Sequence, residues 1–189
     1  GPKERGRAVA GVYVMLTKKG PKFFADTAIN QDPTAERVAE IAVQAAELVK
    51  RMNIEPSIAL LSYSNFGSSD GKTPKKMRDA LRILHENHPD LTVDGEMQAN
   101  FAVDKHQLKE QFPFSDLVGS PPNIFIFPGL SSANIGYKLL QSMAGMEAVG
   151  PLVIGLDYPA HVLQLGADVR EIVNTTAMAV VDAQSRETR

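Results

Sequence analysis

Residues 123–151 read NIFIFPGLSSANIGYKLLQSMAGMEAVGP and give the clearest indication of the chain's architecture. The apolar run 124–127 predicts a buried strand, and Pro128 and Gly129 end it in a turn. The polar residues that follow stand where a helix should begin: Ser131, Ser132 and Asn134. In an open α/β sheet, this order places a polar loop at the carboxyl end of a strand, beside a helix N-terminus. Such folds bind anionic ligands at that place.

The N-terminal part predicts a strand pair and a long helix. Residues 8–16 and 22–25 are rich in valine and aromatic residues, and the sequence KKGP separates them, so we expect a hairpin. Asp32 or Thr34 then caps a helix that runs to Met52. Its apolar residues recur at helical spacing: Val38, Ile41, Ala42, Ala45, Leu48 and Val49.

The remaining elements alternate in the same way. A strand at 58–61 leads through the polar loop 62–73 (SYSNFGSSDGKT) into a helix at 74–87, and a brief strand at 91–94 ends at Gly95. We expect further a helix at 100–111, a strand at 152–154 and a final helix at 168–183. The residues expected to face inward on that final helix are Val169, Ile172, Val173, Ala177 and Val180. This alternation predicts an α/β fold, a mainly parallel sheet with helices on both faces.

Length and composition set the broad class. The 189 residues carry a net charge of −2 and no cysteine, which excludes disulfides and thiol nucleophiles, and no apolar run is long enough to span a bilayer. We therefore expect a cytoplasmic protein that binds neither nucleic acid nor membrane. We expect one domain at 8–185, with 1–7 as a cleavage scar and linker and 186–189 as a tail. We also expect this chain to be a piece of a longer natural protein.

Isolated residues point weakly to chemistry. His85 and His88 stand near the end of a helix, where a positive charge interacts favourably with the helix dipole. We favour this interpretation over a metal-binding pair. His106 is expected on a solvated face, and His161 has no spacing typical of a catalytic triad. Asp94 and Glu96 offer two carboxylates beside a strand end, for which a hydrogen-bonding turn is the favoured interpretation over acid/base chemistry.

The loop at 65–72 (NFGSSDGK) is a second place that could bind a phosphate. Its small residues let backbone amides approach a ligand, and cations follow it at Lys72, Lys75, Lys76 and Arg78. The loop matches no dinucleotide or nucleotide-hydrolase glycine pattern. Spacing alone leaves the alternative open, which is a flexible loop beside a solvated lysine face.

Five stretches together resemble the phosphate acetyltransferase family: FFADTAINQDPTAERVAEIA, ALLSYSNFGSSDG, DGEMQANFAV, NIFIFPGLSSANIGYKLLQ and EAVGPLVIGL. The resemblance covers residues 11–183. It implies a fold like isocitrate and isopropylmalate dehydrogenases, with two α/β subdomains and a coenzyme A site in the cleft between them. This chain resembles the later part, and the earlier subdomain is largely absent.

The departures from that family concern its reactive side chains. Active members read Leu-Ser-Arg-Gly where this chain has LQLG at 163–166, so Gln164 replaces the serine and Leu165 the arginine that are taken to hold thioester and phosphate. Glu171 falls where the family carries a catalytic aspartate. Leucine makes no bidentate, charge-assisted contact with phosphate, so we expect acetyl transfer to be lost. Arg170, five positions after Leu165, is a candidate to compensate, but we expect it on a different face of the final helix.

The sequence SYSNFGSS at 62–69 and the altered segment are similar to the C-terminal domain of bacterial hybrid malic enzymes. That resemblance implies a degenerate domain that senses acetyl-CoA and forms homo-oligomers. Its partner is a malic enzyme domain of the same chain, which converts malate to pyruvate with NADP and a divalent metal. The implied neighbours of acetyl-CoA are Asn65, Ser68, Ser69, Lys72, Asn134, Tyr137, Lys138 and Arg170.

These neighbours have different implied roles. Lys72 and Lys138 meet phosphates and Tyr137 packs on the ligand, while the four amide and hydroxyl side chains form hydrogen bonds near the thioester or pantetheine. For Tyr137 and Lys138, core packing with a snorkelling lysine is the alternative. Two other functions stay open, an authentic phosphate acetyltransferase fragment and a scaffold that only oligomerises.

Overall fold

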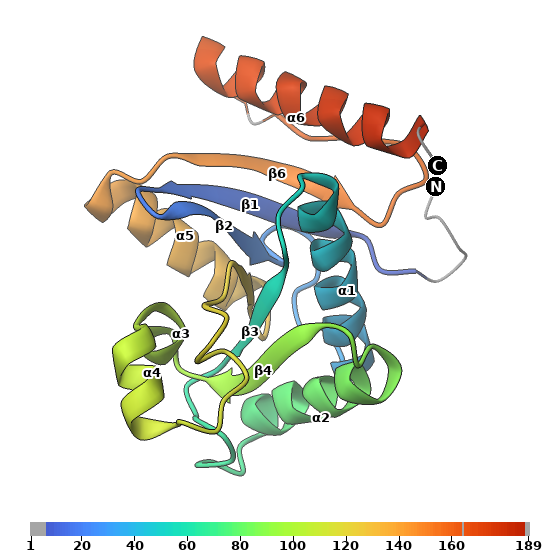
Figure 1. Cartoon of the computed structure of the whole chain (residues 1–189). Coiled ribbons are helices and arrows are strands. Elements are labelled where there is room, and N and C mark those ends of the chain that lie inside the picture. Colours follow the sequence, from blue (N-terminus) through green and yellow to red (C-terminus); the bar gives the residue numbers. More distant parts are fainter. Residues whose placement is uncertain (1–6, 164, 188–189) are drawn as a thin grey trace.

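The computed structural model describes residues 7–163 and 165–187, which form one six-stranded sheet and its helices (Figure 1). In chain order the elements are β1 (Ala10–Thr17), β2 (Gly20–Ala25), α1 (Ala35–Arg51), β3 (Ser57–Leu61), α2 (Lys72–Asn87), β4 (Thr92–Met97), α3 (Ala99–Val103), α4 (Lys105–Gln111), β5 (Ile124–Ile126), α5 (Leu130–Ala144), β6 (Ala148–Ile154) and α6 (Val169–Glu187).

The strand order is β4-β3-β5-β2-β1-β6. The pairings β2–β5, β5–β3 and β3–β4 are parallel, whereas β1 runs antiparallel to both β2 and β6. The predicted hairpin is confirmed, with a register from Val12 opposite Ala25 to Thr17 opposite Gly20. The mainly parallel α/β sheet is therefore confirmed, and its antiparallel part lies at the β6 edge.

Both faces of the sheet are covered, as predicted. One core cluster joins α1 and α2 to the sheet through residues such as Ile41 and Met77, and the other joins α3, α4 and α5 through Phe101, Leu108 and Tyr137. The predicted cap of α1 is also found, because the Thr34 side chain accepts a hydrogen bond from the Arg37 N–H at 3.3 Å. The apolar periodicity of the sequence was sufficient for these elements.

Several predicted boundaries were wrong, including the start of the strand expected at 152–154, since β6 begins at Ala148. The helix expected at 100–111 is two short helices, because the Asp104 carboxylate accepts the N–H groups of His106 and Gln107 and so starts α4 afresh. The strand expected to end at Gly95 continues to Met97. Gly95 has a φ of 144°, and a Cβ there would lie 2.6 Å from the Leu60 carbonyl oxygen, so a glycine lets the strand pass.

The orientation predicted for the final helix was also wrong. All five residues expected to face inward are exposed, and Val169, Ile172 and Val173 expose 78%, 43% and 58% of their surface. The helix α6 lies outside the β6 edge (Figure 1), where it buries Thr175 and Asp182 and half-buries Asn174, Met178, Ala179 and Ala183. It runs to Glu187, two residues into the expected tail. None of the described helices is long and apolar enough to cross a membrane.

Candidate functional site

The loops after β2, β3 and β5 lie together, because these parallel strands have their carboxyl ends on the same side of the sheet. A lysine of α2 ties them together. The Lys76 Nζ lies 2.6 Å from Asp32 Oδ1 and donates to the Pro128 carbonyl at 2.7 Å. The Leu130 N–H donates to the Gln31 carbonyl at 3.1 Å. The edge that the sequence predicted as a ligand site is therefore a connected surface.

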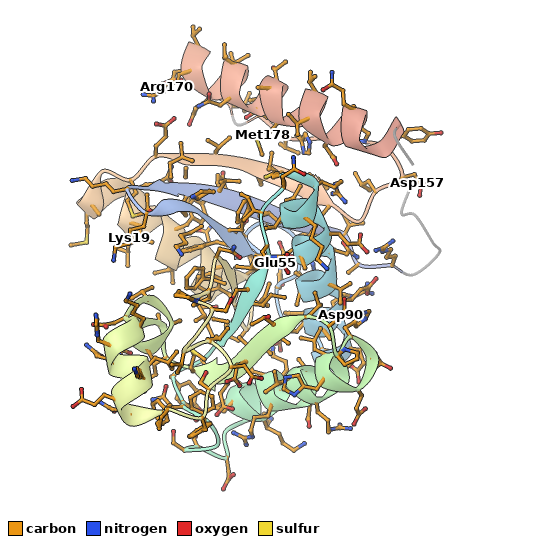
Figure 2. The ribbon with its side chains drawn as sticks, viewed as in Figure 1. Lys19, Glu55, Asp90, Asp157, Arg170 and Met178 are labelled. Carbon is orange, nitrogen blue, oxygen red and sulfur yellow. The ribbon has the colours of Figure 1, made fainter. Side chains whose placement is uncertain are left out.

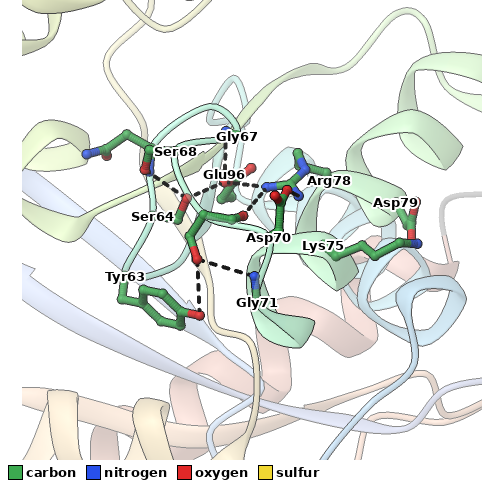
Figure 3. A network of polar contacts seen from close by, with 12 residues as sticks. Tyr63, Ser64, Gly67, Ser68, Asp70, Gly71, Lys75, Arg78, Asp79 and Glu96 are labelled. Atoms are coloured by element: carbon green, nitrogen blue, oxygen red, sulfur yellow. Dashed lines mark hydrogen bonds and ion pairs between the residues drawn. The ribbon is translucent and has the colours of Figure 1, made fainter.

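The loop after β3 wraps around one buried carboxylate, as Figure 3 shows. Glu96 is 0% exposed, and its Oε1 accepts hydrogen bonds from Ser64 Oγ at 2.7 Å, from the Gly67 N–H at 3.0 Å and from Arg78 Nη1 at 3.0 Å. Arg78 also donates to the Ser69 carbonyl at 3.0 Å. These bonds hold the loop in place, so the alternative of a flexible loop is not what the structure shows.

The loop residues predicted to bind a ligand use their polar atoms within the loop or, for Asn65, on the backbone after β4. Asn65 Oδ1 accepts the Gln98 N–H at 2.8 Å, and Ser68 Oγ accepts the Asn65 N–H at 3.0 Å. Ser69 Oγ accepts the Gly71 N–H at 3.2 Å. A ligand at this loop would have to share or replace these bonds.

Most of the cations near this loop are paired. Lys75 lies 3.1 Å from Asp79, and Lys76 and Arg78 hold Asp32 and Glu96. The hydrogen bond from Lys76 and its charge hold the pKa of Asp32 below the usual range. Within the described ranges, Lys72 at the start of α2 is exposed and has no ion-pair partner. Lys72 is therefore the lysine at this loop that remains open to an anion.

The three predicted residues of α5 have different surroundings. Tyr137 is buried and stacks on Tyr13 with the ring centroids 4.2 Å apart, which is the core-packing alternative. Lys138 is exposed, with its Nζ 5.3 Å from the centre of the Tyr137 ring, and Asn134 is half-buried. Burial and the bond to Tyr137 raise the pKa of Tyr13. Lys138 and Asn134 thus remain accessible, and the Tyr137 ring does not.

The segment expected to be catalytically altered lies near β6, the outermost strand on one side of the sheet. Leu165 is fully exposed, and Gln164 lies outside the described residues. Glu171 forms a reciprocal cap with Asp168, because each side chain accepts the other residue's N–H, at 2.8 and 3.1 Å. Arg170 is 74% exposed and forms an ion pair with Glu147 at 2.9 Å.

Arg170 is not close to the loop after β3. The strands β3 and β6 are four steps apart in the sheet order, roughly 19 Å at about 4.8 Å per step. Figure 2 likewise shows Arg170 on α6, at the opposite end of the molecule from α2. The structure therefore does not gather all eight predicted ligand neighbours into one site.

Two of the histidines, His85 and His161, and the acidic pair have structural partners, while His106 is exposed as expected. The His85 Nε2 lies 3.1 Å from the Val93 carbonyl oxygen, and the His161 Nδ1 accepts the Val153 N–H at 3.1 Å. Asp94 Oδ2 accepts from Ser115 Oγ at 2.6 Å, so the hydrogen-bonding interpretation of the acidic pair describes both carboxylates. In the chain as far as the structure describes it, no group of three metal-ligating side chains occurs.

Sequence reasoning missed the two residues that position these loops, Glu96 as a buried hub and Asp26. Asp26 Oδ1 accepts the N–H groups of Gly11 at 2.9 Å, Ala28 at 2.9 Å and Ile29 at 3.1 Å, and Oδ2 accepts that of Asn30 at 2.6 Å. The one available signal was position, because each acid stands at or directly after the end of a strand.

Comparison with known proteins gives one consistent family. The family model described as phosphate acetyl/butaryl transferase matches residues 1–180. The NADP-dependent malic enzyme of Haemophilus influenzae is 44% identical over 184 residues, which are 97% of this chain but 24% of that protein. The phosphate acetyltransferase of Clostridium acetobutylicum is 37% identical over 185 residues, 94% of this chain and 55% of that protein.

Solved structures agree with this result. A phosphotransacetylase from Streptococcus pyogenes superposes with a TM-score of 0.87 at 37% identity and covers 94% of this chain and 54% of its own. The EutD phosphotransacetylase from Staphylococcus aureus gives 0.86 at 30% identity and covers 95% and 56%. The chain thus spans about half the length of these transferases and a quarter of the malic enzymes.

Proposed function

The chain belongs to the phosphate acetyl/butaryl transferase family, and from this premise we propose that it is a catalytically degenerate member that senses acetyl-CoA and self-associates within a longer malic enzyme. The identity to NADP-dependent malic enzymes, 43–44%, exceeds the 36–40% to phosphate acetyltransferases. A sensing role requires ligand binding and subunit contacts but no transfer chemistry.

The observation that carries the proposal is the fully exposed Leu165, at the position where the family resemblance implies a phosphate-holding arginine. A leucine gives no hydrogen bond and no charge to a phosphate or an oxyanion. Arg170, the candidate for compensation, is already paired with Glu147 at 2.9 Å. We therefore propose that acetyl transfer is lost in this domain.

We propose that acetyl-CoA binds along the carboxyl edge of the sheet, with Lys72 and Lys138 as its phosphate contacts. Both lysines are exposed, and Lys72 has no ion-pair partner among the described residues. Hydrogen bonds to the ligand then come from four polar side chains, those of Asn65, Ser68, Ser69 and Asn134. Tyr137 supports α5 from the core, and Arg170 has no direct part unless the ligand reaches the β6 edge.

Self-association is supported by apolar side chains that face solvent on two helices. The helix α5 exposes Ile135, Leu139 and Met143 in a row spaced by four residues. The helix α6 carries the outward row described above, and its residues 174–181 include no charged side chain. Rows of this kind on a surface mark contact sites. We propose that a homo-oligomer covers at least one of them.

The parent reaction is a further part of the proposal. Similarity to malic enzymes implies that a nicotinamide cofactor, a divalent metal and malate bind in a separate domain of the same natural protein. Malic enzymes described as NADP-dependent and as NAD-dependent are both relatives, at 44% and 39% identity, and the cofactor that we propose is NADP.

Calorimetric titration of acetyl-CoA into this chain and into the natural full-length protein tests the sensing role. We expect saturable binding, with a loss of at least tenfold in affinity for Lys72→Ala. The control is Lys75→Ala, because Lys75 is held by Asp79 on the same helix. Absence of binding to both proteins would rule out the sensing role.

Two alternatives make different predictions. An authentic phosphate acetyltransferase would form acetyl phosphate in the full-length protein at a rate well above background, and Leu165→Arg would not be needed for it. A scaffold that only oligomerises would keep its assembly, and acetyl-CoA would inhibit malate oxidation equally in the wild type and in a Lys72→Ala, Lys138→Ala variant. We expect neither result.

A further inference from the structure

A second cleft opens at the amino ends of the parallel strands, away from the loops described above. It has a volume of about 1030 Å³, which suits a small organic ligand. The turn between β1 and β2 forms one side, the junction of α3 and α4 forms another, and the end of α5 closes it. Lys19, labelled in Figure 2, marks the position of that turn.

The floor of the cleft is apolar. The rings of Phe24 and Phe125 lie there with centroids 5.3 Å apart. The other apolar lining residues include Met15, Ala102, Val103, Leu140 and Met146. Val103 is 70% exposed, so one wall of the cleft presents an aliphatic side chain to solvent. A ligand with an aliphatic body would bury this surface.

One cation sits against this floor. The Lys22 Nζ donates to the Pro122 carbonyl at 2.7 Å and lies 5.9 Å from the centre of the Phe125 ring. No carboxylate pairs with Lys22 within residues 7–163 and 165–187. Burial, and then the charge of Lys19, lower the pKa of Lys22. A partly buried ammonium without a carboxylate gains from any anion that reaches it.

The rim adds positive charge in a chain whose net charge is −2. Lys19 and Lys105 line the cleft together with Lys22. The one carboxylate among the lining residues, Asp104, accepts the N–H groups of His106 at 2.9 Å and Gln107 at 3.1 Å, and these bonds lower the pKa of Asp104. Asp104 is thus engaged with α4, and Lys22 keeps N–H donors for a ligand.

We propose that this cleft binds an organic anion composed of an aliphatic acyl chain and one oxyanion head group. The chain lies on Phe24 and Phe125, and the head group pairs with Lys22. The site is separate from the acetyl-CoA site proposed above, because it lies at the opposite ends of the same strands. Its occupation does not depend on the family's reaction.

Three probes separate the two halves of the ligand in calorimetric titrations of this 189-residue chain. Octanoate carries the chain and the charge, 1-octanol carries the chain alone, and acetate carries the charge alone. We expect octanoate to bind at least tenfold more tightly than either of the other two. Equal affinities for octanoate and octanol would overturn the pairing with Lys22.

Substitution locates the site. Lys22→Met keeps the aliphatic stem and removes the charge, and we expect it to weaken octanoate at least tenfold, with an unchanged circular dichroism spectrum. Lys109→Met is the control, because Lys109 is exposed on α4 and does not line the cleft. If Lys22→Met unfolds, the double variant Lys19→Met, Lys105→Met takes its place, and we expect a loss of about threefold. Wild-type affinity in these variants contradicts the proposal.

Two further outcomes would assign the cleft differently. Displacement of octanoate by acetyl-CoA would make it part of the acetyl-CoA site and overturn its independence, whereas we expect no displacement. Octanoate affinity that rises on dilution, together with a dimer in light scattering, would show that a second copy of the chain fills the cleft. Because the probe contains no coenzyme A, failure here leaves the acetyl-CoA titrations unaffected.

Discussion

The β4 and β6 edges of the sheet differ in which side chains they bury and which they leave exposed. At the β4 edge, the fully buried Glu96 accepts hydrogen bonds from three donors and the loop after β3 closes over it. At the β6 edge, α6 turns Thr175 and Asp182 inward and leaves a row of valines to solvent. The β4 side of the molecule therefore satisfies its own polar side chains, whereas the apolar face of α6 has no cover among residues 7–163 and 165–187.

The largest expected effect tests the β4 edge. Glu96→Ala removes the acceptor of Ser64, Gly67 and Arg78 at a site with no solvent access, so we expect about 3 kcal/mol less free energy of unfolding in urea. Glu110→Ala changes an exposed acid on α4 and should stay within about 0.5 kcal/mol of the wild type. Equal stability of the two variants would mean that the loop does not depend on Glu96.

A smaller effect is expected where α6 meets the rest of the chain. Asp182 Oδ1 lies 3.1 Å from Arg51 Nε, and both side chains are largely buried. Asp182→Ala should cost about 2 kcal/mol and speed amide exchange in α6 but not in α2. Asp90→Ala removes an exposed pair with Lys50 at 3.9 Å and serves as the control. Uniform exchange changes in both helices would contradict a local attachment.

The outward valines predict an asymmetry between two matched substitutions. Val93→Asp places a charge in the core beneath α2 and should prevent folding, whereas Val173→Asp on α6 should change the free energy of unfolding by less than about 0.5 kcal/mol. If a homo-oligomer covers α6, Val173→Asp also lowers the mass found by light scattering. A large loss of stability in the monomeric Val173→Asp variant would show that the outward face is in fact packed.

The smallest effect concerns the exposed contact between Asp32 and Lys76. The hydrogen bond and charge of Lys76 hold the pKa of Asp32 below its value in the unfolded chain. This contribution is present above the unfolded pKa and is lost as the pH falls through the folded pKa. Urea midpoints should therefore decline less steeply below about pH 4 in Lys76→Met than in the wild type. Parallel declines would remove Lys76 as the cause.

Local patterns carried most of the fold because they have a direct physical period. The helical spacing from Val38 to Val49 and the hairpin break KKGP predicted α1 and the β1–β2 pair, and the stretch 123–151 predicted β5 and α5. The apolar periodicity at 168–183 correctly predicted the helix α6, but the face expected to point inward is exposed. Periodicity identifies an apolar face, but what that face meets depends on neighbours that the local pattern does not contain.

The candidate site divides in the same way. The sequence showed where polar loops follow strands, and the resemblance gave the altered positions Gln164 and Leu165. The sequence did not show that Lys76 pairs with Asp32 and Arg78 with Glu96, because these partners stand 44 and 18 positions away along the chain. Pairing across such separations follows from the parallel register of β3 and β4 and from the loops at their ends.

The α/β class, the hairpin, the polar loops after the strands and the leucine at position 165 could all be read from the amino-acid sequence. Four features became visible only in the folded chain: Glu96 organises the loop, Tyr137 belongs to the core, the apolar row of α6 faces outward, and Lys22 lies over an apolar floor. The physical reason is range. Backbone propensity and periodicity act between neighbours along the chain, whereas burial and charge pairing depend on which distant segments the sheet brings together.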